Sequence, residues 1–211
     1  MILTVGSRQY PAGRVFCIGR NYVEHVRELG NQTPSRPVIF MKPVQCLLPE
    51  GQPIRMPRHG AELHHEAELV LLLDPRGGEP GWQDVAGIGL GIDLTLRDVQ
   101  DELKQRGLPW ELAKAFEGSA PIGRFVSAAA VADPASIRFE LSVNGSIRQR
   151  GDCSLMIFPV SAMLRGLSEA WVLRPGDLVF TGTPAGVGPL RCGDRVEVQA
   201  PAIGRAGWDV V

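Results

Sequence analysis

The sequence predicts a mixed, mainly β fold with a few short helices. Glycine and proline account for 25 and 17 of the 211 residues and divide the chain into short segments. Residues 138–143 and 195–198 alternate between polar and apolar side chains, as strands with one buried face do. Asn144 and Gly145 follow the first of these segments and predict a hairpin turn. Together these patterns argue against an all-helical fold.

The expected elements form a loop-rich N-terminal portion, about residues 1–50, and a main sheet in about 51–211, within one domain. The first portion should hold strands at 15–18 and 38–41 and a helical segment at 22–29. The clearest helix covers 96–106, because Thr95 and Asp98 are a pair suited to cap its first turn and Gly107 and Pro109 can end it. We also expect a helix at 158–167 and strands at 69–73, 88–92 and 177–180.

The bulk composition indicates a protein that acts on small molecules. Hydrophobic residues make up 44% of the chain and the formal net charge is -1, with arginines scattered along it. This distribution does not suggest a nucleic-acid-binding surface. The four cysteines form no Cys-x-x-Cys pair and are interpreted as reduced thiols. We see no signal peptide and no membrane span, so we expect a cytoplasmic protein without a membrane partner.

Two carboxylates stand directly before the most apolar segment of the chain. Glu66 and Glu68 are two residues apart, so in a strand they point to the same face. Like charges there are costly unless a cation or a shared proton compensates them. Asp93 ends the next apolar segment, and three carboxylates without a nearby cysteine suit magnesium, manganese or calcium better than zinc. The alternative is a solvated strand face, with Asp93 capping a turn.

Cationic and polar side chains follow the third carboxylate. Arg97, Gln100 and Lys104 share one face of the expected helix and could bind a substrate carboxylate, since a guanidinium can hold it with two hydrogen bonds. The alternative is a solvated helix face with Arg97 paired to Asp101. Lys114 is flanked by apolar residues and could stabilise an enolate, although such lysines often extend to solvent.

Two further segments suggest chemistry. Glu28 stands three residues after His25 and could orient the imidazole so that its other nitrogen takes a proton from water; a surface pair is the alternative. The glycine-rich segment 181–189 could bring backbone N–H groups and a hydroxyl to an anionic ligand. Neither this segment nor Gly87-x-Gly89-x-Gly91 has the spacing of a nucleotide-binding loop. We therefore do not expect nucleotide binding.

Taken in order, these segments resemble the fumarylacetoacetate hydrolase superfamily, specifically its small single-domain branch of acylpyruvases and oxaloacetate decarboxylases. The resemblance extends from about residue 15 to 189. It rests on Gly19-Arg20-Asn21-Tyr22 with His25 and Glu28, Phe40-Met41-Lys42-Pro43, His64-His65-Glu66-Ala67-Glu68-Leu69, the segment 93–100, Pro109-Trp110 with Lys114, and the segment 181–188.

The resemblance implies a β-sandwich roll, usually assembled as a homodimer, with a lid in the N-terminal portion. It implies that magnesium or manganese is held by Glu66, Glu68 and Asp93; calcium could occupy the same site. The residues that would bind substrate are Arg20, Arg97, Gln100 and Thr183, and the catalytic residues would be His25, Glu28 and Lys114. Lys42-Pro43 is expected to border the pocket through its backbone.

The expected activity is metal-dependent hydrolysis of the C–C bond of short acylpyruvates, which are 2,4-dioxo acids, to pyruvate and a carboxylic acid. Oxaloacetate decarboxylase or oxaloacetate enol–keto tautomerase is the alternative, and 2-hydroxyhepta-2,4-diene-1,7-dioate isomerase is a third. Outside the enzymes, a ligand-binding protein with a degenerate site is the competing hypothesis, against which the complete residue set argues. Leu96 stands where many acylpyruvase-like relatives carry alanine, and this difference could alter the substrate preference.

Overall fold

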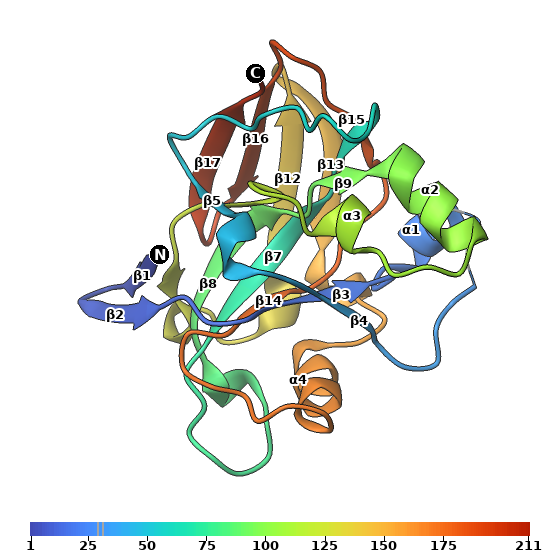
Figure 1. Cartoon of the computed structure of the whole chain (residues 1–211). Helices are drawn as coiled ribbons and strands as arrows, with labels where there is room; N and C mark the ends of the chain where they lie inside the picture. The colour runs from blue at the N-terminus through green and yellow to red at the C-terminus, as the bar shows by residue number, and fades with distance from the viewer. Residues whose placement is uncertain (29, 31) are drawn as a thin grey trace.

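Two β-sheets packed face to face form the main body in the computed structural model, which describes residues 1–28, 30 and 32–211 (Figure 1). The larger, eight-stranded sheet has the order β4 (Val38–Lys42), β3 (Val15–Gly19), β14 (Leu178–Phe180), β7 (Ala67–Leu73), β8 (Val85–Ile92), β10 (Ala120–Ile122) and β5 (Leu47–Pro49), with β11 (Val126–Ser127) beside β8. The smaller sheet is antiparallel, in the order β13 (Ser146–Asp152), β12 (Arg138–Val143), β16 (Arg195–Ala200) and β17 (Gly204–Asp209).

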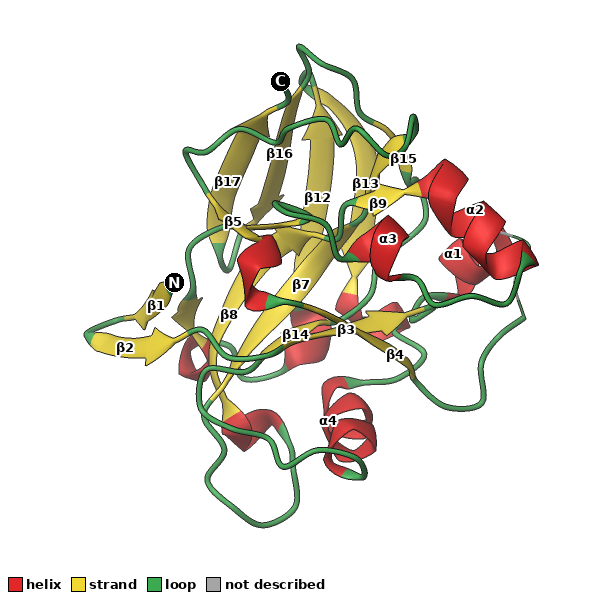
Figure 2. Cartoon of the chain, viewed as in Figure 1, coloured by secondary structure: helices red, strands yellow, loops and turns green. Residues whose placement is uncertain are grey.

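Shorter elements surround these sheets. Strands β15 (Gly188–Pro189), β6 (Leu63–His65) and β9 (Thr95–Leu96) form a third sheet, and β1 (Ile2–Val5) and β2 (Arg8–Pro11) form a hairpin. The α-helices are α1 (Val23–Glu28), α2 (Arg97–Gln105), α3 (Glu111–Lys114) and α4 (Val160–Ser168). Short 3₁₀ helices cover Val44–Cys46, Trp82–Asp84, Ala128–Ala130, Pro134–Ser136 and Cys153–Leu155. Strands predominate (Figure 2), so the predicted mixed, mainly β fold is confirmed.

The central strand β7 is buried on both faces, and its alternation separates two hydrophobic cores. Leu71 packs in the core between the two large sheets, whereas Val70 and Leu72 pack in a second core on the opposite face. Successive side chains of a strand point to opposite faces. Glu66 and Glu68 therefore extend the face of Val70 and Leu72, away from the smaller sheet.

The glycines of β8 allow close packing beside these carboxylates. Gly91 pairs with Glu68 across the β7–β8 ladder. A Cβ at Gly91 would lie 2.8 Å from side-chain atoms of Phe180 and Val70 and 2.9 Å from the carbonyl oxygen of Pro121. The glycine repeat is thus explained by packing.

The predicted hairpin is present between β12 and β13. Its turn residues Asn144 and Gly145 have φ values of 51° and 76°, the left-handed conformation that a two-residue hairpin turn of this kind requires. Asparagine and glycine adopt this conformation most readily, which is why this local prediction succeeds.

The predicted cap of the helix after Asp93 is wrong. The residue before α2 is Leu96, and no side chain caps the helix. Thr95 lies in β9, where its hydroxyl donates to the carbonyl oxygen of Asp93 at 3.1 Å. Asp98 accepts hydrogen bonds from the backbone N–H of Ala61 at 2.8 Å and of Glu62 at 3.3 Å. Asp98 thus makes tertiary contacts and Thr95 belongs to a strand, so neither side chain caps the helix.

The other helices differ slightly from expectation. The predicted helix at 158–167 is α4, which starts after Pro159 and ends at Ser168. Helix α1 ends at Glu28, and the predicted end at Leu29 lies outside the described residues. The sequence analysis missed the four-residue helix α3, which ends at Lys114.

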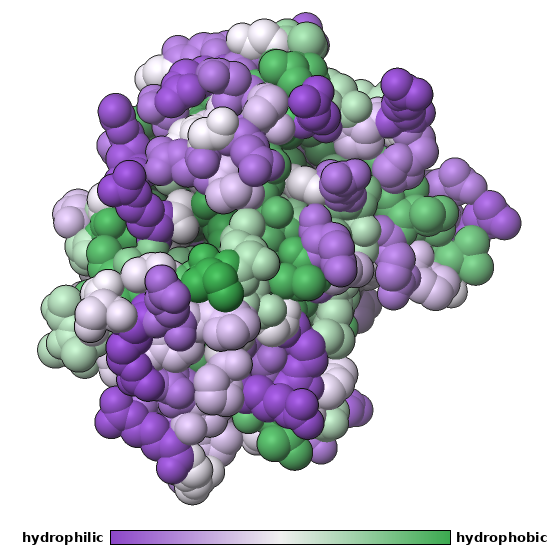
Figure 3. Space-filling model, turned by 60° about the vertical axis from the view of Figure 1, so that its left-hand side comes forward, coloured by the Kyte–Doolittle hydropathy of each residue, from purple (hydrophilic) through white to green (hydrophobic). Residues whose placement is uncertain are grey.

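The surface of the protein combines apolar and hydrophilic areas. Among the described residues, no helix has the length and apolarity needed to cross a membrane. Figure 3 shows hydrophobic residues gathered across the middle of one face, between more hydrophilic ends. Exposed apolar area of this kind is found at protein interfaces. The homodimer, the cytoplasmic location and the division of one domain into lid and roll stay predictions.

Candidate functional site

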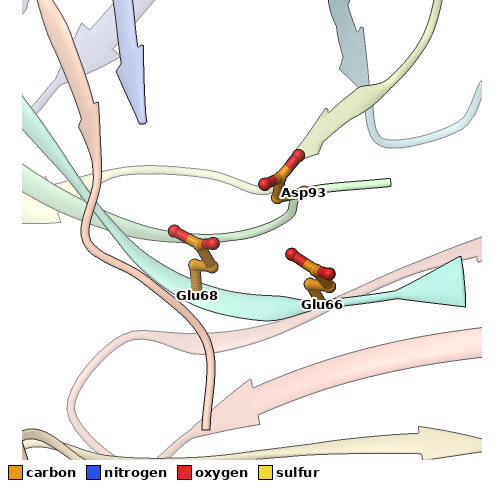
Figure 4. A group of neighbouring side chains, drawn as sticks. All are labelled: Glu66, Glu68 and Asp93. Atoms are coloured by element: carbon orange, nitrogen blue, oxygen red, sulfur yellow. The ribbon is translucent and has the colours of Figure 1, made fainter. Parts of the chain in front are cut away.

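Glu66, Glu68 and Asp93 meet at the end of the β7–β8 pair (Figure 4). The two strands are antiparallel, and the Asp93 N–H donates to the carbonyl oxygen of Glu66 at 2.8 Å just beyond their last paired residues. Each carboxylate is buried, and one oxygen from each lies within 4.8 Å of the other two. The predicted convergence is therefore present, while the metal role stays a prediction.

Two cationic side chains contact the Glu66 side of this cluster. The Lys114 ammonium lies 2.8 Å from Glu66 Oε2 and 2.6 Å from Asp93 Oδ2. The Arg97 guanidinium donates to Glu66 Oε1 and, at 2.6 Å, to Gln100 Oε1. Burial favours the neutral amine of Lys114, but Asp93 and Glu66 outweigh it and raise the lysine pKa. Arg97 is thus not paired as on a solvated helix face, and Lys114 does not extend to solvent.

Among the described residues, no cationic side chain forms an ion pair with Glu68, which instead accepts a backbone hydrogen bond from Gly182 at 2.6 Å. Burial, together with the charges of Asp93 and Glu66, raises the pKa of Glu68 well above its usual value. Burial also acts to raise the pKa of Glu66, but Lys114 and Arg97 bring it well below that value. An all-oxygen set with one poorly compensated buried carboxylate fits a hard divalent cation.

Lys42 lies behind Asp93 and is the main residue whose side chain the sequence analysis overlooked. Its Nζ is 2.8 Å from Asp93 Oδ1 and donates to the carbonyl oxygens of Leu94 at 3.2 Å and Ser119 at 2.9 Å, and also to that of Lys114. The side chain is fully buried. A lysine at the end of the apolar strand β4 was the available signal.

The predicted His25–Glu28 pair is present in α1. His25 is buried, with Nδ1 3.1 Å from Glu28 Oε2. Glu28 Oε1 accepts the Gly186 N–H at 2.9 Å, so one carboxylate contacts both α1 and the loop after β14. Gly186 has a φ of 95°, and a Cβ there would lie 2.2 Å from the Arg148 carbonyl oxygen. Burial of His25 argues against a simple surface pair.

Thr183 is held by Gln149, a residue absent from the prediction. Gln149 Nε2 donates to Thr183 Oγ1 at 2.8 Å and to the Pro184 carbonyl oxygen at 2.9 Å. Its Oε1 accepts from the Ala67 N–H at 2.9 Å and lies 3.0 Å from His65 Nδ1. This buried amide connects the Thr183 loop to the strand that carries the glutamates. Its only sequence signal is a polar residue at a buried position of β13.

These side chains line one cavity. Every predicted site residue except Glu28 contributes to its wall, together with Ile18, Gly19, Phe40, Lys104 and Trp110. Arg20 has a φ of 59°, a left-handed conformation that is rare outside glycine and concentrated at functional sites. The loop 181–189 contributes differently than expected, because the Gly182 N–H binds Glu68 of the protein itself.

Comparisons with known proteins agree with this geometry. The family model described as fumarylacetoacetate (FAA) hydrolase C-terminal matches residues 14–211. Mitochondrial oxaloacetate tautomerase FAHD1 of Mus musculus is 46% identical over 196 residues, covering 90% of this chain and 89% of the relative. Oxaloacetate tautomerase YcgM of Escherichia coli (strain K12) is 42% identical over 194 residues, with the same coverage.

Among solved structures, fumarylpyruvate hydrolase from Pseudomonas aeruginosa in complex with Mn²⁺ and pyruvate matches with a TM-score of 0.93. It is 37% identical, and the match covers 100% of this chain and 95% of that one. Agreement of this extent in sequence and in fold shows that the chain belongs to the fumarylacetoacetate hydrolase family.

Proposed function

We propose that the protein is a metal-dependent oxaloacetate enol–keto tautomerase. The observation that carries the proposal is the convergence of three buried carboxylates with Arg97 and Lys114 in one cavity. The choice of reaction rests on the two oxaloacetate tautomerases that are 46% and 42% identical over 90% of the chain. The hydrolase reading, which the sequence analysis put first, becomes the second candidate.

The cavity suits a 2-oxo acid bound beside the carboxylate cluster. Glu66, Glu68 and Asp93 would hold Mg²⁺ or Mn²⁺. When bound, the ion would supply positive charge that stabilises the enolate oxygen of a bound 2-oxo acid. Lys114, whose three N–H groups contact Glu66, Asp93 and Thr95, would place positive charge beside the same oxygen, and Arg97 would clamp the adjacent carboxylate.

His25 is the proposed proton carrier. Its Nδ1 faces Glu28, so Nε2 is the nitrogen left to exchange a proton with the substrate. In tautomerisation this nitrogen would remove a proton from C3 of the keto form, or return it to C3 of the enolate. Glu28 would fix the orientation of the ring and stabilise its charged form.

Hydrolysis of acylpyruvates is the second candidate, favoured by the fold match to a fumarylpyruvate hydrolase at a TM-score of 0.93. His25 Nε2 would then take the proton from water, which attacks the acyl carbonyl. The C–C bond would then break, and the pyruvate part would leave as an enolate held beside the carboxylate cluster by Lys114 and Arg97. The two reactions thus differ in what His25 deprotonates.

The test compares three reactions on one preparation. Purified protein with Mg²⁺ or Mn²⁺ is given oxaloacetate, and the ultraviolet absorbance of the enol is followed alongside release of pyruvate and cleavage of acetylpyruvate. We expect metal-dependent enol–keto interconversion that Asp93→Asn and Lys114→Met abolish. Arg106→Met is the matched control, because Arg106 directly follows α2 but pairs with exposed Glu102. Acetylpyruvate cleavage without accelerated tautomerisation would overturn the proposal in favour of hydrolysis.

A further inference from the structure

The cavity wall carries two cationic side chains for which the proposed reaction has no task. Arg20 and Lys104 line the cavity together with Arg97 and Lys114. The three carboxylates of the wall all belong to the proposed metal site. Once those are committed to a divalent ion, the four cations of the described wall exceed the anionic charge available to them.

Lys104 is partly desolvated, and the carboxylate with which it pairs is mostly exposed. Its side chain is 25% exposed, and the nearest carboxylate oxygen, on the mostly exposed Asp101, lies 3.7 Å from Nζ. The ammonium stands 6.0 Å from the centre of the Trp110 ring, which forms part of the cavity wall. Burial lowers the pKa of Lys104, and the positive charges of Arg97 and Arg20 act in the same direction. All three cations line the same cavity.

Arg20 is held at the cavity in a costly backbone conformation. Its φ of 59° is unfavourable for a residue with a Cβ, and such strain persists only when the surroundings enforce it. The next residue, Asn21, is fully buried and supplies this constraint. Its Nδ2 donates to the Thr181 carbonyl oxygen at 2.8 Å and its Oδ1 accepts from the Phe158 N–H at 2.7 Å. Among the described residues, no carboxylate forms an ion pair with Arg20.

The helix geometry orders the cations along the cavity. Arg97 and Lys104 are seven residues apart on one face of α2, a rise of about 10 Å. Arg97 contacts Glu66 at the metal end, so Lys104 lies about two turns further out. A substrate anchored at the metal end by its 2-oxo-carboxylate would thus extend toward Lys104, in a cavity whose wall also includes Arg20.

We propose that Arg20 and Lys104 bind a second carboxylate of the substrate, so that the protein selects dicarboxylic 2-oxo acids over monocarboxylic acids of the same length. The inference rests on the proposed function only for the anchoring of the 2-oxo end at the metal. It distinguishes oxaloacetate and other diacids from simple acylpyruvates such as acetylpyruvate.

The test measures binding without turnover. Malate and 2-hydroxybutanoate share a 2-hydroxy-carboxylate, but malate has a carboxylate where 2-hydroxybutanoate has a methyl group, and neither has a keto group to enolise. Their dissociation constants are measured by titration calorimetry on Mn²⁺-loaded protein. A charge-assisted contact typically changes affinity about 10- to 100-fold, so the wild type should prefer malate by that factor.

The variants assign this preference to the two cations. Lys104→Met removes the charge and keeps the stem, and Arg20→Asn introduces a residue that tolerates the left-handed conformation. Each should lower the preference for malate about tenfold, whereas Lys104→Arg should restore most of it. Arg106→Met, at the residue that caps the C-terminus of the same helix and lies outside the cavity wall, should keep the wild-type ratio.

The outcomes separate this inference from the proposed reaction. An unchanged malate preference in both charge-removing variants refutes the second-carboxylate site, even if oxaloacetate is turned over. Equal weakening of both acids in Lys104→Met refutes selection and leaves only general attraction of anions. If neither acid binds the loaded wild type at millimolar concentration, the site is refuted as well. Intact malate preference without tautomerase activity refutes the reaction and supports the site.

Discussion

Replacing each glutamate of the carboxylate cluster by glutamine should change the stability of the metal-free protein in opposite directions. Glu66 contacts Arg97 and Lys114, whereas Glu68 accepts a backbone hydrogen bond from Gly182. We expect Glu68→Gln to stabilise the metal-free protein and Glu66→Gln to destabilise it. The two substitutions are chemically identical and only two positions apart, so each is the control for the other.

The magnitudes follow from the distances. Two unit charges at 4.8 Å repel by about 3.5 kcal/mol at an effective dielectric constant of 20, and the ligand oxygens lie within that distance. Part of this repulsion is offset by the Gly182 N–H, so we expect Glu68→Gln to gain about 2 kcal/mol, or roughly 4–8 °C in Tm. Glu66→Gln removes the charge that both buried Arg97 and Lys114 contact, leaves Arg97 without an ion pair and should lose about 3–5 kcal/mol.

The assay is thermal unfolding in the presence of a chelator at several pH values. Because the folded-state pKa of Glu68 is raised, its contribution to stability is fully present below the unfolded pKa and is lost as pH rises through the folded pKa. The advantage of Glu68→Gln over wild type should therefore grow from acid to neutral pH. Added Mn²⁺ should raise the Tm of wild type but not that of Glu68→Gln. Equal destabilisation by both substitutions at neutral pH would refute the reasoning.

Three further predictions concern residues around the cluster. Lys42→Met should lower the free energy of unfolding by about 3–5 kcal/mol, because it leaves a buried carboxylate and several carbonyls without their donor; an unchanged urea midpoint would contradict it. His25→Ala should slow acetylpyruvate cleavage by roughly 10²- to 10⁴-fold and oxaloacetate decarboxylation less, with Glu28→Gln following it. Wild-type cleavage rates in both would reduce the pair to a surface feature. Gln149→Leu and Thr183→Val should both raise KM, by an amount equivalent to about 1–3 kcal/mol. If Gln149→Leu lowers stability and leaves KM unchanged, the role of Gln149 is purely structural.

The sequence was sufficient to predict the carboxylate cluster, because the two-residue period of a strand decides which side chains share a face. Alternation along β7 and the residue before it places Glu66 and Glu68 on one face. The neighbouring strand β8 is antiparallel, so Asp93, which directly follows β8, lies beside them. Asp93 therefore meets the glutamates without any long-range information beyond the pairing of two consecutive strands. The turn at Asn144 and Gly145 was predictable for a similar reason, since its conformation is a property of those two residues.

Prediction from local pattern failed where the partner is distant in sequence. Lys42 reaches the Leu94 carbonyl across 52 residues, and Gln149 reaches the Ala67 N–H across 82. No periodicity in either segment specifies these pairings. The prediction that Thr95 caps the helix failed although Thr95 satisfies the local rule. Its hydroxyl accepts a hydrogen bond from Lys114 at 2.6 Å instead. A residue that satisfies a local rule is thus used elsewhere when a buried charge needs a partner.

In the proposed mechanism, Glu28 would link closure of the cavity to the preparation of His25 as the proton carrier. One of its oxygens lies 3.1 Å from His25 Nδ1 and the other accepts the Gly186 N–H at 2.9 Å. If α1 moved away from the loop after β14, the carboxylate would have to leave Gly186 or release the imidazole. In either proposed reaction His25 needs that carboxylate to hold its ring and to stabilise its charged form. The base would therefore be competent only when the entrance is closed and bulk water is excluded, which protects an enolate from unwanted protonation.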